Sequence, residues 1–177
     1  MSQTELFRQM ATYNQWMNEK VIEAASRLDT IDITRNRGAF FGSILGTLNH
    51  MVVGDTLWLK RFATHPSGAE SLRQVAAQPN PTSLYQRLFD DLAALRDHRR
   101  WLDGDIIRWV EGLKESDMDQ TLAYRRIEGQ ACNKRLSHLV LHFFNHQTHH
   151  RGQISTLLSQ AGEDIGVTDL LHLLPEQ

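Results

Sequence analysis

The sequence has little of several features that would mark a particular class of protein. Its one cysteine, Cys132, cannot form an internal disulfide, which fits a reducing compartment. No stretch approaches the roughly 18 apolar residues of a membrane-spanning helix, and the first ten residues do not follow the pattern of a secretory signal. The 19 basic and 21 acidic residues give a net charge of −2, and no basic patch stands out. We therefore expect a cytoplasmic protein that binds neither membranes nor nucleic acid.

The chain instead has the composition of one ordinary globular domain over residues 1–177, with 41% hydrophobic and 23% charged residues. Apolar residues recur at spacings of three and four, which is typical of amphipathic helices. This pattern predicts helices over residues 4–28, 42–63, 82–113 and 133–161. Residues 64–81 hold three of the four prolines and form one long connection between the second and third helices. Residues 121–130 predict either a short hairpin or an ordered loop. The fold class is therefore all-α, a four-helix bundle.

Histidines are concentrated in the last predicted helix, where five of the nine lie between residues 138 and 150. When the helix is drawn at 100° per residue, His146 and His150 fall within the apolar stripe, whereas His138, His142 and His149 lie on its flank. Two imidazoles spaced i, i+4 on one face can hold the same metal ion. The alternative is that each ring forms a hydrogen bond with a neighbouring side chain, as buried polar groups must. The position of the pair within the stripe favours a metal.

Two polar residues of the second predicted helix are further candidates. Asp55 lies within the main apolar stripe, and His50 lies on the opposite face with Gly46 one turn before it and Gly54 one turn after it. Each glycine costs a helix about 1 kcal/mol relative to alanine, and both leave space for a closely packed helix or for a ligand. Periodicity alone favours Asp55 as readily as His50.

The run from Asn145 to Gln153 resembles the signature of the damage-inducible DinB-like family, also described as DinB/YfiT-like metalloenzymes. The resemblance extends over nearly the whole chain and includes the segments 13–16, 48–50, 122–124 and 166–170. It implies a four-helix bundle of the up-down-down-up type, often a homodimer. It also implies a metal site with three histidine ligands, which by position are His50, His146 and His150.

The implied three-histidine site leaves at least one coordination position open, which is typical of catalytic rather than structural sites. Zn, Ni and Fe all suit imidazole ligands. The open position can take water or the sulfur of a small thiol, and the metal lowers the pKa of either group. Relatives in the family include transferases and isomerases that use low-molecular-weight thiols, so the resemblance favours the thiol.

We thus predict a metal-dependent transferase or hydrolase that acts on a small-molecule substrate. The alternative is a non-catalytic metal-binding or interaction protein, in which the metal stabilises the bundle or the dimer. No general base is evident, so no catalytic side chain is assigned. The candidates for lining the pocket are Tyr13, Asn14, Asp55 and Gln147.

Overall fold

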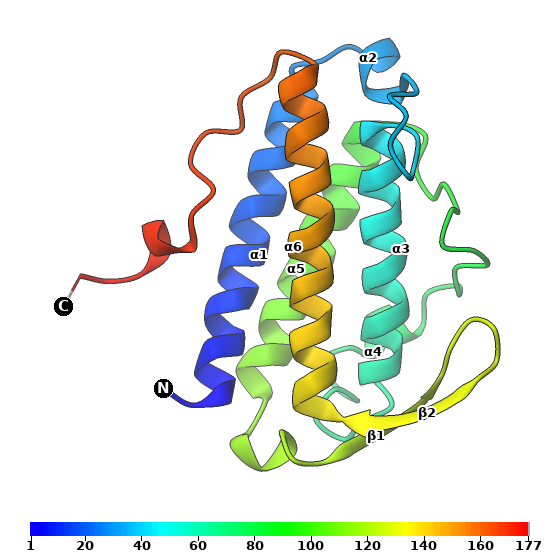
Figure 1. The fold of residues 1–177 in the computed structure, drawn as a ribbon. Helices are drawn as coiled ribbons and strands as arrows, with labels where there is room; N and C mark the ends of the chain where they lie inside the picture. Colours follow the sequence, from blue (N-terminus) through cyan, green and yellow to red (C-terminus); the bar gives the residue numbers. More distant parts are fainter. Residues whose placement is uncertain (177) are drawn as a thin grey trace.

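Within residues 1–176, which the computed structural model describes, four long helices lie side by side (Figure 1). They are α1 (Gln3–Ser26), α3 (Ile44–Phe62), α5 (Leu92–Gly112) and α6 (Leu136–Gln160). Helices α1 and α6 ascend in the view of Figure 1, and α3 and α5 descend. Helix α1 packs against α5 and α6, and α3 packs against the same two helices. The sequence prediction of a mostly helical chain is confirmed.

Shorter elements connect the long helices. They are α2 (Thr30–Thr34), α4 (Arg73–Ala76), the 3-10 helices η1 (Glu115–Asp117) and η2 (Leu170–Leu173), and the strands β1 (Thr121–Arg125) and β2 (Ala131–Arg135). Strands β1 and β2 pair in antiparallel register to form the hairpin that the sequence left as one of two alternatives. The chain is therefore helical with a small two-stranded sheet. None of the described helices is long and apolar enough to cross a membrane.

The third long helix begins ten residues later than the periodicity predicts, at Leu92 rather than near residue 82. The reason is a contact with α3, where the Asn49 side chain accepts hydrogen bonds from the backbone amides of Leu88 and Phe89, both at 2.8 Å. These bonds replace the ones that a helix would supply, and the side chain of Asp91 then caps the start of α5. The long connection consequently runs over residues 63–91, with α4 inside it.

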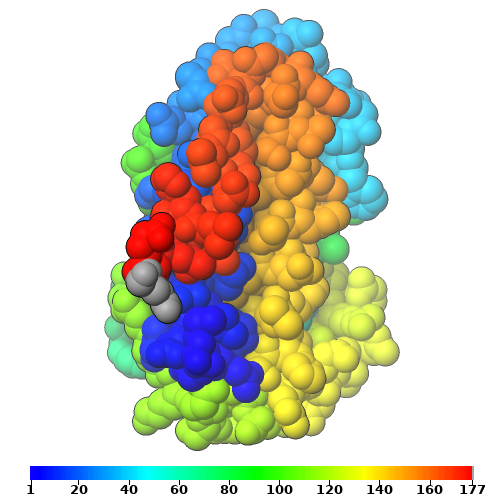
Figure 2. Space-filling view, turned by 60° about the vertical axis from the view of Figure 1, so that its left-hand side comes forward, coloured from blue at the N-terminus to red at the C-terminus, as the bar shows by residue number. Residues whose placement is uncertain are grey.

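Aromatic side chains fill the core between the long helices. Phe62 stacks on Trp109 with ring centroids 4.5 Å apart, and Phe143 meets the same Phe62 edge-on at 6.0 Å. The C-terminal segment lies over α1 and beside α6 (Figure 2), where Trp16 stacks on His172.

Candidate metal centre

Helices α3 and α6 pack directly against each other and bring three histidines together. His50 lies on α3, and His146 and His150 lie one turn apart on α6. The Nε2 atom of His150 is 3.1 Å from Nε2 of His50 and 3.1 Å from Nε2 of His146. Each ring thus offers one nitrogen to a common point, and the three offered atoms all lie within 4.8 Å of one another.

The opposite nitrogens of two of these rings show where the protons are. Nδ1 of His50 is 2.9 Å from the carbonyl oxygen of Leu84, and Nδ1 of His150 is 2.8 Å from Oε1 of Gln153. Because these oxygens only accept hydrogen bonds, both Nδ1 atoms carry the proton. The Nε2 atoms then present lone pairs to each other at 3.1 Å, an arrangement that is repulsive unless a cation or a proton lies between them.

The spacing of the nitrogens suits a metal ion. Two imidazole nitrogens bound at about 2.0–2.1 Å are roughly 3.3 Å apart at a tetrahedral angle and roughly 2.9 Å apart at a right angle. The two separations of 3.1 Å fall between these values. The donor set, three neutral imidazoles, also matches the preference of divalent transition metals.

All three rings are held in the neutral form that binds metal. Burial, followed by the nearby histidines, lowers the pKa of His146 to about 3. Burial lowers the pKa of His150 to about 4, partly opposed by its hydrogen bond to Gln153. Burial also lowers the pKa of His50. At neutral pH a metal ion therefore has no protons to displace from these nitrogens.

Two residues shape the space around the rings. Phe41, in the loop before α3, stacks on His50 with centroids 3.7 Å apart and an interplanar angle of 15°. A Cβ atom at Gly54 would stand 3.0 Å from Cε1 of His146, so this glycine makes room for that ring. Gly46 has a different neighbour, because a Cβ there would collide with the carbonyl oxygen of Phe41. Of the two glycines that flank His50 in the sequence, only Gly54 therefore makes room for the histidine cluster, and the ring it accommodates is that of His146.

Sequence reasoning missed both groups that orient the rings. Gln153 follows His150 by three residues, and this i, i+3 spacing is the signal that identifies it. Leu84 contributes its backbone carbonyl from the long connection, 34 residues from His50. A backbone group leaves no mark in the residue pattern, so no sequence signal points to it.

A cavity of about 210 Å³ opens beside the histidines. Its walls come from α3, from α6, from the long connection and from the turn of the hairpin. The lining residues are His50, Gly54, Leu57, Trp58, Arg61, Leu84, Arg126, Ile127, Glu128, His142 and His146. This volume suits a small molecule or a part of one.

None of the four side chains that the sequence predicts to line the pocket is among the residues that line this cavity. They are Tyr13, Asn14, Asp55 and Gln147. The Tyr13 hydroxyl donates to the carbonyl oxygen of Thr168 at 2.8 Å, which fixes the C-terminal segment on α1. The Asn14 amide donates to Asp103 at 3.2 Å within the core.

Asp55 is fully buried and takes part in a polar network that contains none of the three histidines. Arg99 pairs with Asp55, and with Asp103 at 2.9 Å, and the Gln147 amide donates to Asp55. Burial raises the pKa of Asp55 to about 6, and the attraction of Arg99 opposes that rise. The two acids and the arginine thus hold α3 and α5 together.

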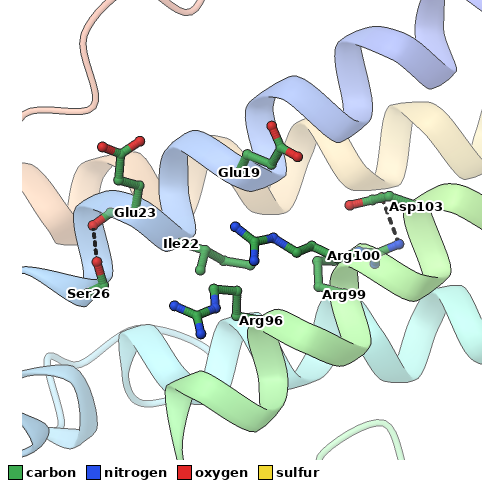
Figure 3. A pocket seen from close by; sticks show the side chains of 8 residues that line it. All are labelled: Glu19, Ile22, Glu23, Ser26, Arg96, Arg99, Arg100 and Asp103. Carbon is green, nitrogen blue, oxygen red and sulfur yellow. Dashed lines mark hydrogen bonds and ion pairs between the residues drawn. The ribbon is translucent and has the colours of Figure 1, made fainter.

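A second cavity, of about 270 Å³, lies between α1 and α5 (Figure 3). Three acidic and three basic side chains line it together with Ile22 and Ser26: Glu19, Glu23, Asp103, Arg96, Arg99 and Arg100. Positive and negative charges are equal in number, so this cavity has no excess of either sign. None of the three clustered histidines lines it.

The chain is similar to known proteins. The model of the family described as "DinB family" matches residues 1–176. Protein DinB of Bacillus subtilis (strain 168) is 23% identical over 159 residues, which cover 89% of this chain and 87% of that protein. No solved structure matches the chain significantly.

Proposed function

This chain belongs to the DinB family, and from that premise we propose that it is a metal-binding member whose ligands are His50, His146 and His150. The observation that carries the proposal is the convergence of three Nε2 atoms, with 3.1 Å between neighbours. Two of these rings point their N–H groups away from the cluster, at the Leu84 carbonyl and at Gln153. Groups behind a metal ligand that fix its tautomer and orientation are typical of metal-binding histidines.

We infer that the four long helices form a single-domain four-helix bundle of the up-down-down-up type, with the long connection between α3 and α5. Their side-by-side packing and their directions support this finer assignment. Metal sites in such bundles are built from side chains on facing helices, as α3 and α6 are here. The family resemblance also leads us to propose a homodimer, and light scattering at several protein concentrations tests it.

We further propose that the protein is an enzyme acting on a small molecule, either a thiol-dependent transferase or a hydrolase. A divalent metal with three imidazole ligands supplies an open position where a water or a thiol is acidified. The chain's own residues hold the ligands neutral and oriented, and Phe41 covers one face of the His50 ring by stacking on it. Zn, Ni and Fe are all compatible with this set of donors.

The first experiment is elemental analysis of protein purified without a nickel column. We expect about one equivalent of a transition metal in the wild type, and its loss in His150→Ala. The matched control is His138→Ala, an exposed histidine on the same helix, which should keep the metal. Protein that arrives without metal is titrated with Zn²⁺ and Ni²⁺ by calorimetry. Binding that is absent, or equal in wild type and His150→Ala, would overturn the proposal.

A second experiment separates the enzyme from the non-catalytic alternative, in which the ion merely joins α3 to α6. A catalytic site exchanges its open ligand, so adding a small thiol or an anion should change the visible spectrum of the Co²⁺-substituted protein. An unchanged spectrum would leave the metal with a structural role and refute the catalytic part of the proposal.

A further inference from the structure

Basic side chains gather around the cavity beside the histidines. Two more cavities, of about 550 and 420 Å³, adjoin it, and all three share Arg61 and Arg126 in their linings. We call these three joined cavities the basic groove. Its charged side chains are Lys60, Arg61, Arg125, Arg126, Lys134 and a single acid, Glu128. Five positive charges against one negative charge contrast with the net charge of −2 of the whole chain.

Arg61 holds the central position in the basic groove. Its guanidinium lies over the ring of Trp58 at 4.6 Å and over the ring of Tyr124 at 5.1 Å. These two cation–π contacts fix the guanidinium without using its N–H donors. Among residues 1–176 its side chain takes part in no ion pair and no hydrogen bond within the protein, although it is half-buried.

The same helix carries Arg61 and a histidine of the cluster on one face. Arg61 follows His50 by eleven residues, which is about three helical turns and a rise of roughly 16 Å. Gly54 and Leu57 lie between them on that face, and all four residues line the cavity beside the histidines. A molecule in this cavity can therefore contact the histidine cluster with one end and the guanidinium with the other.

Among residues 1–176 the half-buried guanidinium of Arg61 has no carboxylate partner, so its N–H donors lack an acceptor within the protein. Burial lowers the pKa of Arg61, and the side chain nevertheless stays charged at neutral pH. Glu128 is exposed on the turn of the hairpin and forms no ion pair with Arg61. The planar fork of N–H donors matches an oxyanion, and such charge-assisted pairs are among the stronger hydrogen bonds.

We propose that the basic groove binds the oxyanion group, a carboxylate or a phosphate, of a small molecule whose other end reaches the histidine cluster, and that Arg61 is the residue that binds this group. The inference rests on the proposed metal site for the position of the ligand's other end. It names the class of molecule that the site takes, an anionic compound rather than a neutral or cationic one.

The test uses thiols that differ only in charge and in length. The probes are 3-mercaptopropionate, 6-mercaptohexanoate and 8-mercaptooctanoate, each with its neutral methyl ester, and 6-mercaptohexylphosphonate as the phosphate-like arm. Binding is followed through the visible spectrum of the Co²⁺-loaded protein. We expect the acids to bind roughly tenfold more tightly than their esters, with one chain length preferred. The phosphonate arm identifies which oxyanion the groove selects.

Variants then assign the preference to Arg61. In Arg61→Gln the acid and the ester should bind alike, whereas Arg61→Lys should keep part of the preference because it retains the charge. The matched control is Arg96→Gln, which removes the same charge from the cavity between α1 and α5 and should change nothing. Equal binding of acid and ester to the wild type, or a preference that survives Arg61→Gln, would overturn the inference.

Failure of the metal site gives a different result. If the protein binds no metal, the same acids and esters are titrated into metal-free protein by calorimetry. A preference for acids that depends on Arg61 would then support the groove although the proposed function had failed. Co²⁺ binding with no preference for acids would refute the groove and leave the proposed function standing. Tighter binding of a single-stranded DNA 20-mer than of any acid would also refute it, because the groove would then serve a polyanion.

Discussion

Gly54→Ala tests the contact between α3 and the histidine cluster through a single methyl group. The new Cβ would stand 3.0 Å from Cε1 of His146, and comfortable contact between carbon atoms begins near 3.5 Å. The imidazole must therefore move by roughly half an ångström. Metal–ligand bonds tolerate displacements of only about 0.2 Å. We expect the variant to bind Zn²⁺ about tenfold more weakly, the lower end of the range for losing a group that positions a ligand.

The same substitution should leave the metal-free protein as stable as before or more stable. Replacing glycine within a helix contributes up to about 1 kcal/mol of stability, and the crowding of His146 offsets part of it. At a free Zn²⁺ concentration one hundred times the wild-type Kd, binding stabilises the wild type by about 2.7 kcal/mol. A tenfold weaker variant gains only about 1.4 kcal/mol under the same conditions.

Thermal unfolding with and without Zn²⁺, together with calorimetric titration, measures both effects. Gly104→Ala on α5 is the control, because a Cβ there would meet only Arg108 at 3.5 Å, an ordinary contact. It should raise stability without changing the affinity for Zn²⁺. An unchanged affinity in Gly54→Ala would refute the reasoning, since it would show that the ring of His146 does not have to stay where the structure places it.

Three further experiments test other parts of the structure. Gln153→Ala should weaken Zn²⁺ binding about tenfold or more because His150 loses its orienting acceptor, whereas Gln153→Glu should retain binding; equal affinities in calorimetry would contradict this. Arg99→Met should reduce the free energy of unfolding in urea by about 3–5 kcal/mol because it leaves two buried carboxylates without their cation. Arg96→Met breaks the largely exposed pair of Arg96 with Asp97 and should lower the free energy of unfolding by under ~1 kcal/mol; similar losses in Arg99→Met and Arg96→Met would contradict the assigned network. Burial lowers the pKa of His98 from 6.5 to about 4, so the unfolded chain takes up a proton first as the pH falls. The free energy of unfolding should therefore decline from pH 6.5 towards pH 4, and His98→Phe should lose less of it; equal acid sensitivity of the two proteins would count against a neutral, half-buried ring.

The sequence by itself predicts the long helices, because helix formation depends on neighbours within a turn or two. Side-chain spacing identifies the apolar stripe, and Ser2 and Glu5 form the capping box at the start of α1. It also selects His146 and His150 within the stripe of α6, since both lie one turn apart on one element. The late start of α5 escaped prediction because the competing hydrogen bonds come from Asn49, about forty residues away.

The third histidine shows the limit of local reasoning. Periodicity favoured Asp55 as readily as His50, and only the family resemblance selected His50. The structure separates the two residues by their partners: His50 meets His150 of α6, whereas Asp55 pairs with Arg99 of α5 and accepts a hydrogen bond from Gln147 of α6. Which face of a helix meets which neighbour depends on the packing of the whole chain, and a single helix does not encode it.

The clustering of basic side chains likewise depends on the packing of the whole chain. Along the sequence the basic residues are balanced by acids, and no basic run stands out. Folding brings Lys60 and Arg61 of α3 together with Arg125 and Arg126 of the hairpin and Lys134 of β2. The chain determined which residues could bind a metal or an anion. Only the tertiary structure decided which of them meet, because electrostatic and coordinating groups act across space while sequence patterns report only contacts within one element.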